Sequence, residues 1–396
     1  MALYAFDGTW NEEKTTEDPA YANTNVVRFK DAYHAHSGTD DFYVEGVGTR
    51  FDVLGRVLGG VFGLGELPRI NEAYDHLCKA WAAGDHVIDI VGFSRGAATT
   101  LDFCHRIQER GIRRPGSDEV IEPHPQIRFL GVWDLVAAFG VANLGNTALN
   151  VGHHLSLPTS SLQYCFHALA LDERRLSFLP TRLPGAHEVW FRGVHSDIGG
   201  GNGNRGLNDI TLAWMMRKAM ASKLPIKEED ILALAPNPAA VPRLDRKLRV
   251  SVRLVSAVDS RHYTVAPGEG YTMPPATCPM ETVEDERTAT EVGADGLELA
   301  PPEVRRRIAA LWEAAEAQAA HMDFPIAGVK DDLLTLFQAR VPLVTNDEEL
   351  TRARAAVVQL VALTIEGARE RGFHSATGFF LTEALFKRPR MYPFTD

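Results

Sequence analysis

Cysteine is scarce in this sequence, and the few cysteines are scattered. The chain holds four: Cys78, Cys104, Cys165 and Cys278. They form no CxxC pair and no dense cluster, which excludes a zinc ribbon, a dithiol redox motif and the disulfide framework of a small secreted domain. We therefore expect buried free thiols.

Long apolar runs and a basic leader are also missing. No segment reaches the roughly 18 uninterrupted apolar residues of a membrane-spanning helix. The N-terminus, MALYAFDGTW, has no basic region followed by an apolar stretch, so no signal peptide is predicted. We expect synthesis in the cytoplasm, and export by a route that ignores signal peptides stays open.

Positive charge is in deficit, with 41 Lys and Arg against 52 Asp and Glu and a formal net charge of −11. Such a balance argues against nucleic-acid binding and against steering to anionic membranes by net charge. A local group such as Arg110, Arg113 and Arg114 would still allow peripheral membrane contact. The composition is otherwise ordinary for a globular protein, at 45% hydrophobic and 23% charged residues.

Apolar segments that read as buried strands alternate with segments of helical periodicity in the first half of the chain. Strands are expected at 2–6, 42–46, 86–92, 127–133 and 188–194. Helices are expected at 25–36 (Asn25 as cap), 67–83, 95–110, 160–171 and 208–221 (Asn208 or Asp209 as cap). This alternation predicts an α/β fold with a mostly parallel, α/β-hydrolase-like sheet that helices cover on both faces.

The character of the sequence changes near residue 223, and three regions are predicted. Residues 1–222 form the α/β-hydrolase catalytic core. Residues 223–302 hold a late strand, LRVSVRLVSAV (248–258), and a long loop rich in Pro, Gly, Thr and Glu. Residues 303–396 form a mainly helical C-terminal region packed on the core.

The stretch VGFSRGAA (91–98) follows a strand and precedes a helix, and it contains Gly-x-Ser-x-Gly around Ser94. This is the pattern of a nucleophile elbow, a tight turn that exposes a serine hydroxyl above the sheet edge. The N-terminus of the following helix favours negative charge that develops nearby. The alternative is a glycine-rich turn in which Ser94 only caps the helix.

A serine nucleophile needs a base and a residue that orients the base. Asp134 directly follows the strand at 127–133, and His195 directly follows the strand at 188–194. Both therefore lie at the carboxyl edge, in the chain order Ser, acid, His that this fold uses. We predict a triad of Ser94, Asp134 and His195, in which Asp197 supports the turn after His195 rather than orienting the imidazole.

The oxyanion hole is predicted from two places at the same edge. One donor is the backbone N–H of Arg95, directly after the nucleophile. The other comes from Gly8 or Thr9, in the loop after the strand at 2–6, with Asp7 as a supporting residue that ties the loop down. No cofactor and no metal are expected.

Several long motifs occur in a fixed order along the first 222 residues: FDGTWN, GVGT, RINEAYDHLCKAW, GFSRGAA, GVWDLVAAFG, HALALDERR and VWFRGVHSDIGGG. In this order they resemble a bacterial family of α/β-hydrolases of largely unknown function, whose best-known members are phospholipase effectors of type VI secretion. The resemblance implies an α/β-hydrolase fold and the same three triad residues. Beyond about residue 225 no resemblance is found.

The expected function is a serine esterase that cleaves lipid or phospholipid acyl esters through an acyl-enzyme. The family resemblance carries most of this expectation, and the apolar, glycine-rich loop at 57–68 would cover an acyl cleft. A short-chain carboxylesterase and a non-catalytic interaction protein on a hydrolase scaffold are the alternatives. Protein partners are not predicted.

Two further enzyme classes remain as minor alternatives. FDGT resembles a phosphatase motif, but Ala5 stands where that motif needs its nucleophilic aspartate. A metal-dependent hydrolase would use Asp7, His195 and Asp197, with His153 and His154, at spacings that match no standard metal site.

Overall fold

The computed structural model describes most of residues 1–370. It does not describe residues 9–10, 12, 15–21, 39–40, 47–62, 137–155, 159, 176–177, 179, 184, 244–252, 254, 256, 258, 269–270, 293–301, 327–329, 331–332, 334–336, 338–345 and 371–396. The loop at 57–62, the histidines at 153 and 154 and most of the expected strand at 248–258 fall among them.

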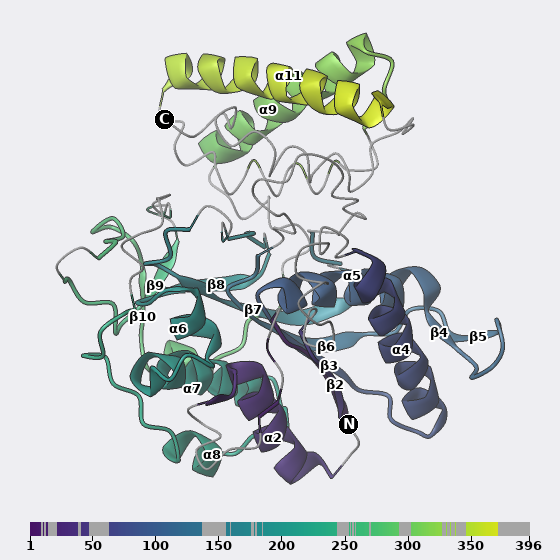
Figure 1. Ribbon diagram of the computed structural model, residues 1–396, viewed down its shortest axis with the longest axis vertical. Coiled ribbons are helices and arrows are strands. Elements are labelled where there is room, and N and C mark those ends of the chain that lie inside the picture. The colour runs from purple at the N-terminus through teal and green to yellow at the C-terminus, as the bar shows by residue number, and fades with distance from the viewer. Residues whose placement is uncertain are drawn as a thin grey trace, which may run out of the picture.

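A parallel sheet forms the centre of the molecule (Figure 1). Its order across the sheet is β10 (Met280–Glu281), β9 (Ser260–His262), β8 (His187–Phe191), β7 (Leu162–Ala170), β6 (Ile127–Trp133), β3 (Ile88–Phe93), β1 (Ala2–Phe6) and β2 (Phe42–Val44). Every neighbouring pair in this sheet is parallel. The predicted fold class, an α/β-hydrolase-like parallel sheet, is confirmed.

Helices cover both faces of the sheet (Figure 1). They are α4 (Gly63–Ala82) and α5 (Arg95–Arg110) on one face, and α2 (Asn25–Ser37), α6 (His195–Gly199), α7 (Arg205–Ala221) and α8 (Glu228–Leu232) on the other. Side chains of β1 alternate between the two apolar layers, so that Tyr4 packs with the α4 and α5 layer and Leu3 with the α2 and α7 layer. Burial on both faces explains why the central strands are almost wholly apolar.

The expected helix at 160–171 is wrong, because this segment forms β7. Its Leu and Ala residues imitate helical spacing, but β7 pairs along its length with β6 on one side and β8 on the other. Seven of its nine residues are buried. The hydrogen bonds and packing of a central strand thus override the helix propensity of the segment.

Three helix starts differ from the expectation. Thr24, not Asn25, caps α2, and its hydroxyl accepts a hydrogen bond from the Val27 N–H. Helix α7 begins at Arg205 with Asn204 at the cap position, four or five residues before the predicted caps. Helix α4 begins at Gly63, inside the segment that its glycines suggested was loop.

The remaining elements extend this core. An antiparallel pair, β4 (Ile112–Arg113) and β5 (Val120–Glu122), follows α5, and a 3-10 turn, η2 (Asp285–Arg287), packs near α7. Helices α9 (Pro302–His321) and α11 (Asp347–Glu370) pack on each other. Their apolar side chains belong to one continuous cluster with the α4 and α5 layer.

Two expectations from composition can be compared with the described residues. All four cysteines are buried free thiols, as predicted. None of the helices in the described part of the chain is long and apolar enough to cross a bilayer.

Candidate active site

Ser94 occupies a strained turn between β3 and α5. Its φ of 58° and ψ of −124° lie outside the regions that non-glycine residues favour. Both flanking positions are too crowded for any residue but glycine. A Cβ on Gly92 would lie 2.7 Å from Thr100 Cγ2, and one on Gly96 would lie 2.4 Å from the carbonyl oxygens of Phe6 and Asp7. The turn thus presses the start of α5 against the end of β1.

The structure brings Ser94, His195 and Asp134 together at the carboxyl edge of the sheet. The Ser94 hydroxyl lies 2.7 Å from His195 Nε2, and His195 Nδ1 lies 2.6 Å from Asp134 Oδ2. All three side chains are buried, with 4%, 5% and 0% of the residue exposed. In this geometry Nδ1–H donates to the carboxylate, so Nε2 is left to accept from the hydroxyl.

Asp134 is held on every side. Its backbone N–H donates to the Ala168 carbonyl at 2.8 Å, and its Oδ1 accepts from the Ala170 N–H at 2.9 Å. The guanidinium of Arg253 contacts both carboxylate oxygens, with Nη2 2.9 Å from Oδ2 and Nη1 against Oδ1. Sequence reasoning missed Arg253, because an arginine within an alternating segment carries no signal for a partner more than 100 positions away.

These contacts set the charge states of the pair. Burial alone would raise the pKa of Asp134, but the Arg253 charge and the hydrogen bond from His195 hold that pKa below its usual range. Burial lowers the pKa of His195, and the attraction of Asp134 offsets this only in part. A neutral imidazole facing an ionised carboxylate is therefore the stable pairing at neutral pH.

The ring of His195 is fixed by packing and by its position at the start of α6. Phe93 and Phe178 pack against it, with ring centroids 4.6 and 4.7 Å away. The His195 backbone N–H donates to Glu173 Oε2 at 3.2 Å. Glu173 also accepts from the guanidinium of Arg175, 2.7 Å away, as part of the HALALDERR motif. The imidazole has little freedom to turn away from Ser94.

Asp197 does not contact the imidazole. Its Oδ2 accepts from the backbone N–H of Val194 at 3.0 Å and of Arg243 at 3.1 Å, and its Oδ1 accepts from the side chains of Asn202 and Asn204 at 2.7 and 2.9 Å. These bonds brace the turn around α6. The supporting role of Asp197 stays a prediction.

The predicted oxyanion donors have unequal support. Arg95 is the first residue of α5, so its N–H lies at the positive end of that helix, beside the Ser94 hydroxyl. Gly8 lies close to Ser94, but its N–H donates to Asp7 Oδ1 at 2.7 Å and would have to leave that bond. Thr9 falls outside the described residues. Gly8 and Thr9 therefore stay predictions.

Hydrogen bonds of Asp7 tie the end of β1 to its surroundings, and its supporting role in the site stays a prediction. Its Oδ2 accepts from the Thr24 hydroxyl at 2.7 Å and from the Tyr43 hydroxyl at 2.9 Å. Burial raises the pKa of Asp7 from 3.8 to about 6, although these hydrogen bonds favour the ionised form. Asp7, His195 and Asp197 do not converge, and in the described part of the chain no three His, Cys, Asp or Glu side chains form a metal-binding group.

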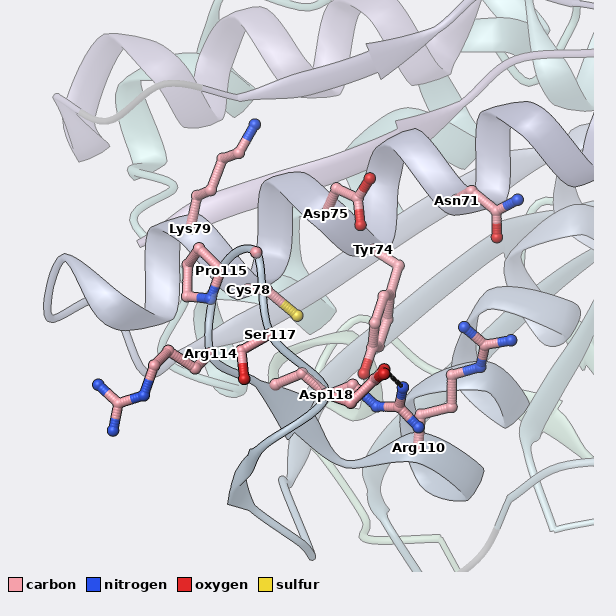
Figure 2. A pocket seen from close by; sticks show the side chains of 12 residues that line it. Asn71, Tyr74, Asp75, Cys78, Lys79, Arg110, Arg114, Pro115, Ser117 and Asp118 are labelled. Atoms are coloured by element: carbon pink, nitrogen blue, oxygen red, sulfur yellow. Dashed lines mark hydrogen bonds and ion pairs between the residues drawn. The ribbon is translucent and has the colours of Figure 1, made fainter.

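A hollow of about 700 Å³ lies between α4 and the turn that joins β4 to β5 (Figure 2). It is at the far end of α5 from Ser94, about 24 Å along a helix of 16 residues. Two arginines of the predicted basic group have acidic partners there: Arg113 pairs with Asp118 at 2.6 Å and Arg114 with Glu119 at 2.7 Å. This pairing offsets part of the positive charge that would still allow peripheral membrane contact.

The fold and this geometry define an α/β-hydrolase-like scaffold with a buried Ser–His–Asp arrangement at the carboxyl edge of its parallel sheet. The sequence matches the family described as "T6SS, Phospholipase effector Tle1-like, catalytic domain" over residues 3–122 and 102–218. Together these segments reach over more than half of the chain, and the chain belongs to this family. No curated protein matches it significantly.

Solved structures offer distant matches. A structure of the Tle1 effector bound to the VgrG spike of the type VI secretion system is 23% identical, with a TM-score of 0.33, and the match covers 52% of this chain and 51% of that one. The chain thus spans about half the length of that effector. An uncharacterised protein from Pseudomonas aeruginosa is 19% identical, with a TM-score of 0.38, and the match covers 92% and 67% of the two chains.

Proposed function

We propose that this chain is a serine hydrolase that cleaves carboxylic esters of lipids, with phospholipid acyl esters as the substrate class. The observation that carries the catalytic part is the pair of short hydrogen bonds from Ser94 to His195 and from His195 to Asp134, at 2.7 and 2.6 Å. The lipid part rests on membership in a family of phospholipase effectors. The same membership supports delivery by a type VI secretion system.

The chemistry follows from the positions of the three side chains. Ser94 Oγ attacks the ester carbonyl while His195 Nε2 takes the hydroxyl proton, and Asp134 stabilises the imidazolium. The tetrahedral oxyanion is stabilised by the N-terminus of α5. Collapse breaks the ester C–O bond, and the leaving alcohol takes its proton from His195. Water, deprotonated by His195, then attacks the acyl-Ser94 ester and releases the fatty acid and the free enzyme.

Substrate class is tested by comparing kcat/KM across p-nitrophenyl esters from acetyl to palmitoyl, together with fatty-acid release from phosphatidylcholine and phosphatidylethanolamine. We expect kcat/KM to rise with chain length beyond acetyl and fatty acid to be released from both lipids. A preference for acetyl esters with no fatty-acid release would replace the lipid hydrolase with a short-chain carboxylesterase. No turnover of any ester would favour a non-catalytic interaction protein.

A further inference from the structure

We propose that Arg253 is a positioning residue for the Ser–His–Asp arrangement, clamping the carboxylate of Asp134 in the orientation that accepts from His195. The inference rests on the proposed function, because it concerns how the reactive serine is activated. Arg253 lies beyond the residues matched to the family, which end at 218, and beyond the predicted catalytic core at 1–222.

The contact has the geometry of a two-point clamp. Both terminal nitrogens of Arg253 face Asp134, with Nη2 2.9 Å from Oδ2 and Nη1 against Oδ1. The same nitrogens donate to main-chain carbonyls, Nη1 to Ala170 at 2.9 Å and Nη2 to Phe178 at 2.6 Å. The Arg253 side chain is 1% exposed. Because the guanidinium is planar and anchored by two carbonyls, it fixes the plane of the carboxylate as well as its position.

Asp134 needs such a partner. Its φ of 40° lies in the left-handed region, which is unfavourable for a residue other than glycine, so the surrounding contacts must hold the backbone there. Its carboxylate is fully buried, and an ionised buried carboxylate is stable only when paired and hydrogen-bonded. The His195 ring supplies one neutral donor. Arg253 supplies the compensating charge, without which Asp134 would take up a proton or turn toward other donors.

Arg253 also affects the basicity of His195. Among the described residues, the charged groups that act on this imidazole are Asp134 after β6, Glu173 after β7 and Arg253 from the segment beyond residue 222. Of these, only Arg253 is a cation, and it both repels an imidazolium and shares the carboxylate that would stabilise one. Removing its charge should therefore let the Asp134–His195 pair take up a proton, on either partner, at higher pH, which moves the acid limb of reactivity to higher pH.

The chain provides a matched control in Arg192. This second buried arginine, with its side chain 4% exposed, pairs with Asp172 at 2.8 Å. It donates to the carbonyls of Thr272 and Ala266 at 3.0 and 2.8 Å. It is thus built like Arg253 but does not contact Ser94, His195 or Asp134. Replacing it should reproduce the general cost of removing a buried arginine without altering the triad.

The experiment measures the second-order rate constant for labelling of Ser94 by a fluorophosphonate between pH 5 and pH 9. It compares the full-length wild type with Arg253→Met, Arg253→Lys and Arg192→Met. For Arg253→Met we expect a rate on the order of 10²-fold lower at the plateau and an acid limb displaced to higher pH. Arg253→Lys keeps the charge without the two-point fork, so its limb should return to the wild-type position while its plateau rate stays intermediate. Arg192→Met should keep the wild-type limb.

An unshifted acid limb in Arg253→Met, or a rate loss no larger than that of Arg192→Met, would overturn the proposal. If Arg253→Met does not fold, Arg253→Lys decides: a wild-type plateau rate would show that the fork is not needed. Wild-type protein whose Ser94 is not labelled at any pH would remove the proposed function, and with it this inference. If Ser94 is labelled in the wild type and Arg253→Met behaves like the wild type, the inference about Arg253 fails while the proposed function stands.

Discussion

Ser94 is held in a backbone conformation that costs on the order of 1–3 kcal/mol and that its surroundings maintain. Gly92 and Gly96 leave room for the turn, and the sequence pattern reveals their role because only glycine fits at such close approaches. Asp134 has a second positive φ, of 40°, at the end of β6. No sequence pattern marks that strain, since aspartate at a strand end is common for other reasons.

The two nearby aspartates should differ sharply in their effect on turnover. Asp134 accepts from His195 Nδ1 at 2.6 Å, whereas Asp197 accepts from Val194, Asn202 and Arg243. Asp134→Asn should lower kcat by about 10²- to 10⁴-fold, because the amide no longer stabilises the imidazolium. Asp197→Asn should mainly lower stability. Ester turnover of both folded variants measures the difference, and a larger loss of kcat in Asp197→Asn would contradict the assignment.

The raised pKa of Asp7 predicts that the stability of the fold depends on pH. Its folded pKa of about 6 lies above the ordinary 3.8, so the stability it contributes is complete below about pH 4 and is lost as pH rises through 6. The loss approaches about 3 kcal/mol. The asparagine side chain of Asp7→Asn cannot ionise. The free energy of unfolding of this variant should therefore rise relative to that of the wild type between pH 5 and pH 7.5. Denaturant unfolding at these two pH values checks this, and a constant difference would contradict the raised pKa.

Helices and strands are predicted best where a single hydrophobic periodicity, that of a helix or that of a strand, dominates the segment. The strands at β1, β3 and β6 and the helix α5 follow from apolar runs and from the glycine pattern at their junction. The strand β7 was predicted as a helix because its Leu and Ala residues fit both structures, and only its pairing with β6 and β8 decides between them. Helix caps were misplaced by one to a few residues for a similar reason, since several capping residues stand close together.

The junction of β1 and α5 gives a prediction at this scale. A Cβ on Gly96 would lie 2.4 Å from two main-chain carbonyl oxygens, which cannot rotate away. Gly96→Ala should therefore push α5 from β1, lower the free energy of unfolding by roughly 1–3 kcal/mol and slow ester turnover. Gly116→Ala is the control, because its Cβ meets nothing within 4 Å and only its φ of 74° is unfavourable. Equal losses of turnover in the two variants would contradict this account.

At the scale of the whole molecule, a parallel sheet gathers residues far apart in the chain at one edge. The approach of Ser94, Asp134 and His195 could be predicted because Ser94 and Asp134 directly follow strands, His195 lies four residues after β8, and their order suits the fold. Arg253 could not, because it reaches the site from a segment whose path no local pattern specifies. The division at residue 222 is therefore not a boundary of the site, since a side chain beyond it completes the contacts of Asp134.

Ester turnover by folded Ser94→Ala, compared with wild type, tests most directly whether Ser94 is the nucleophile. The hydroxyl lies 2.7 Å from His195 Nε2, the group that would take its proton. We predict that Ser94→Ala keeps the wild-type circular dichroism spectrum and loses on the order of 10⁴-fold or more in kcat. Near-wild-type turnover by a well-folded Ser94→Ala protein would contradict this prediction.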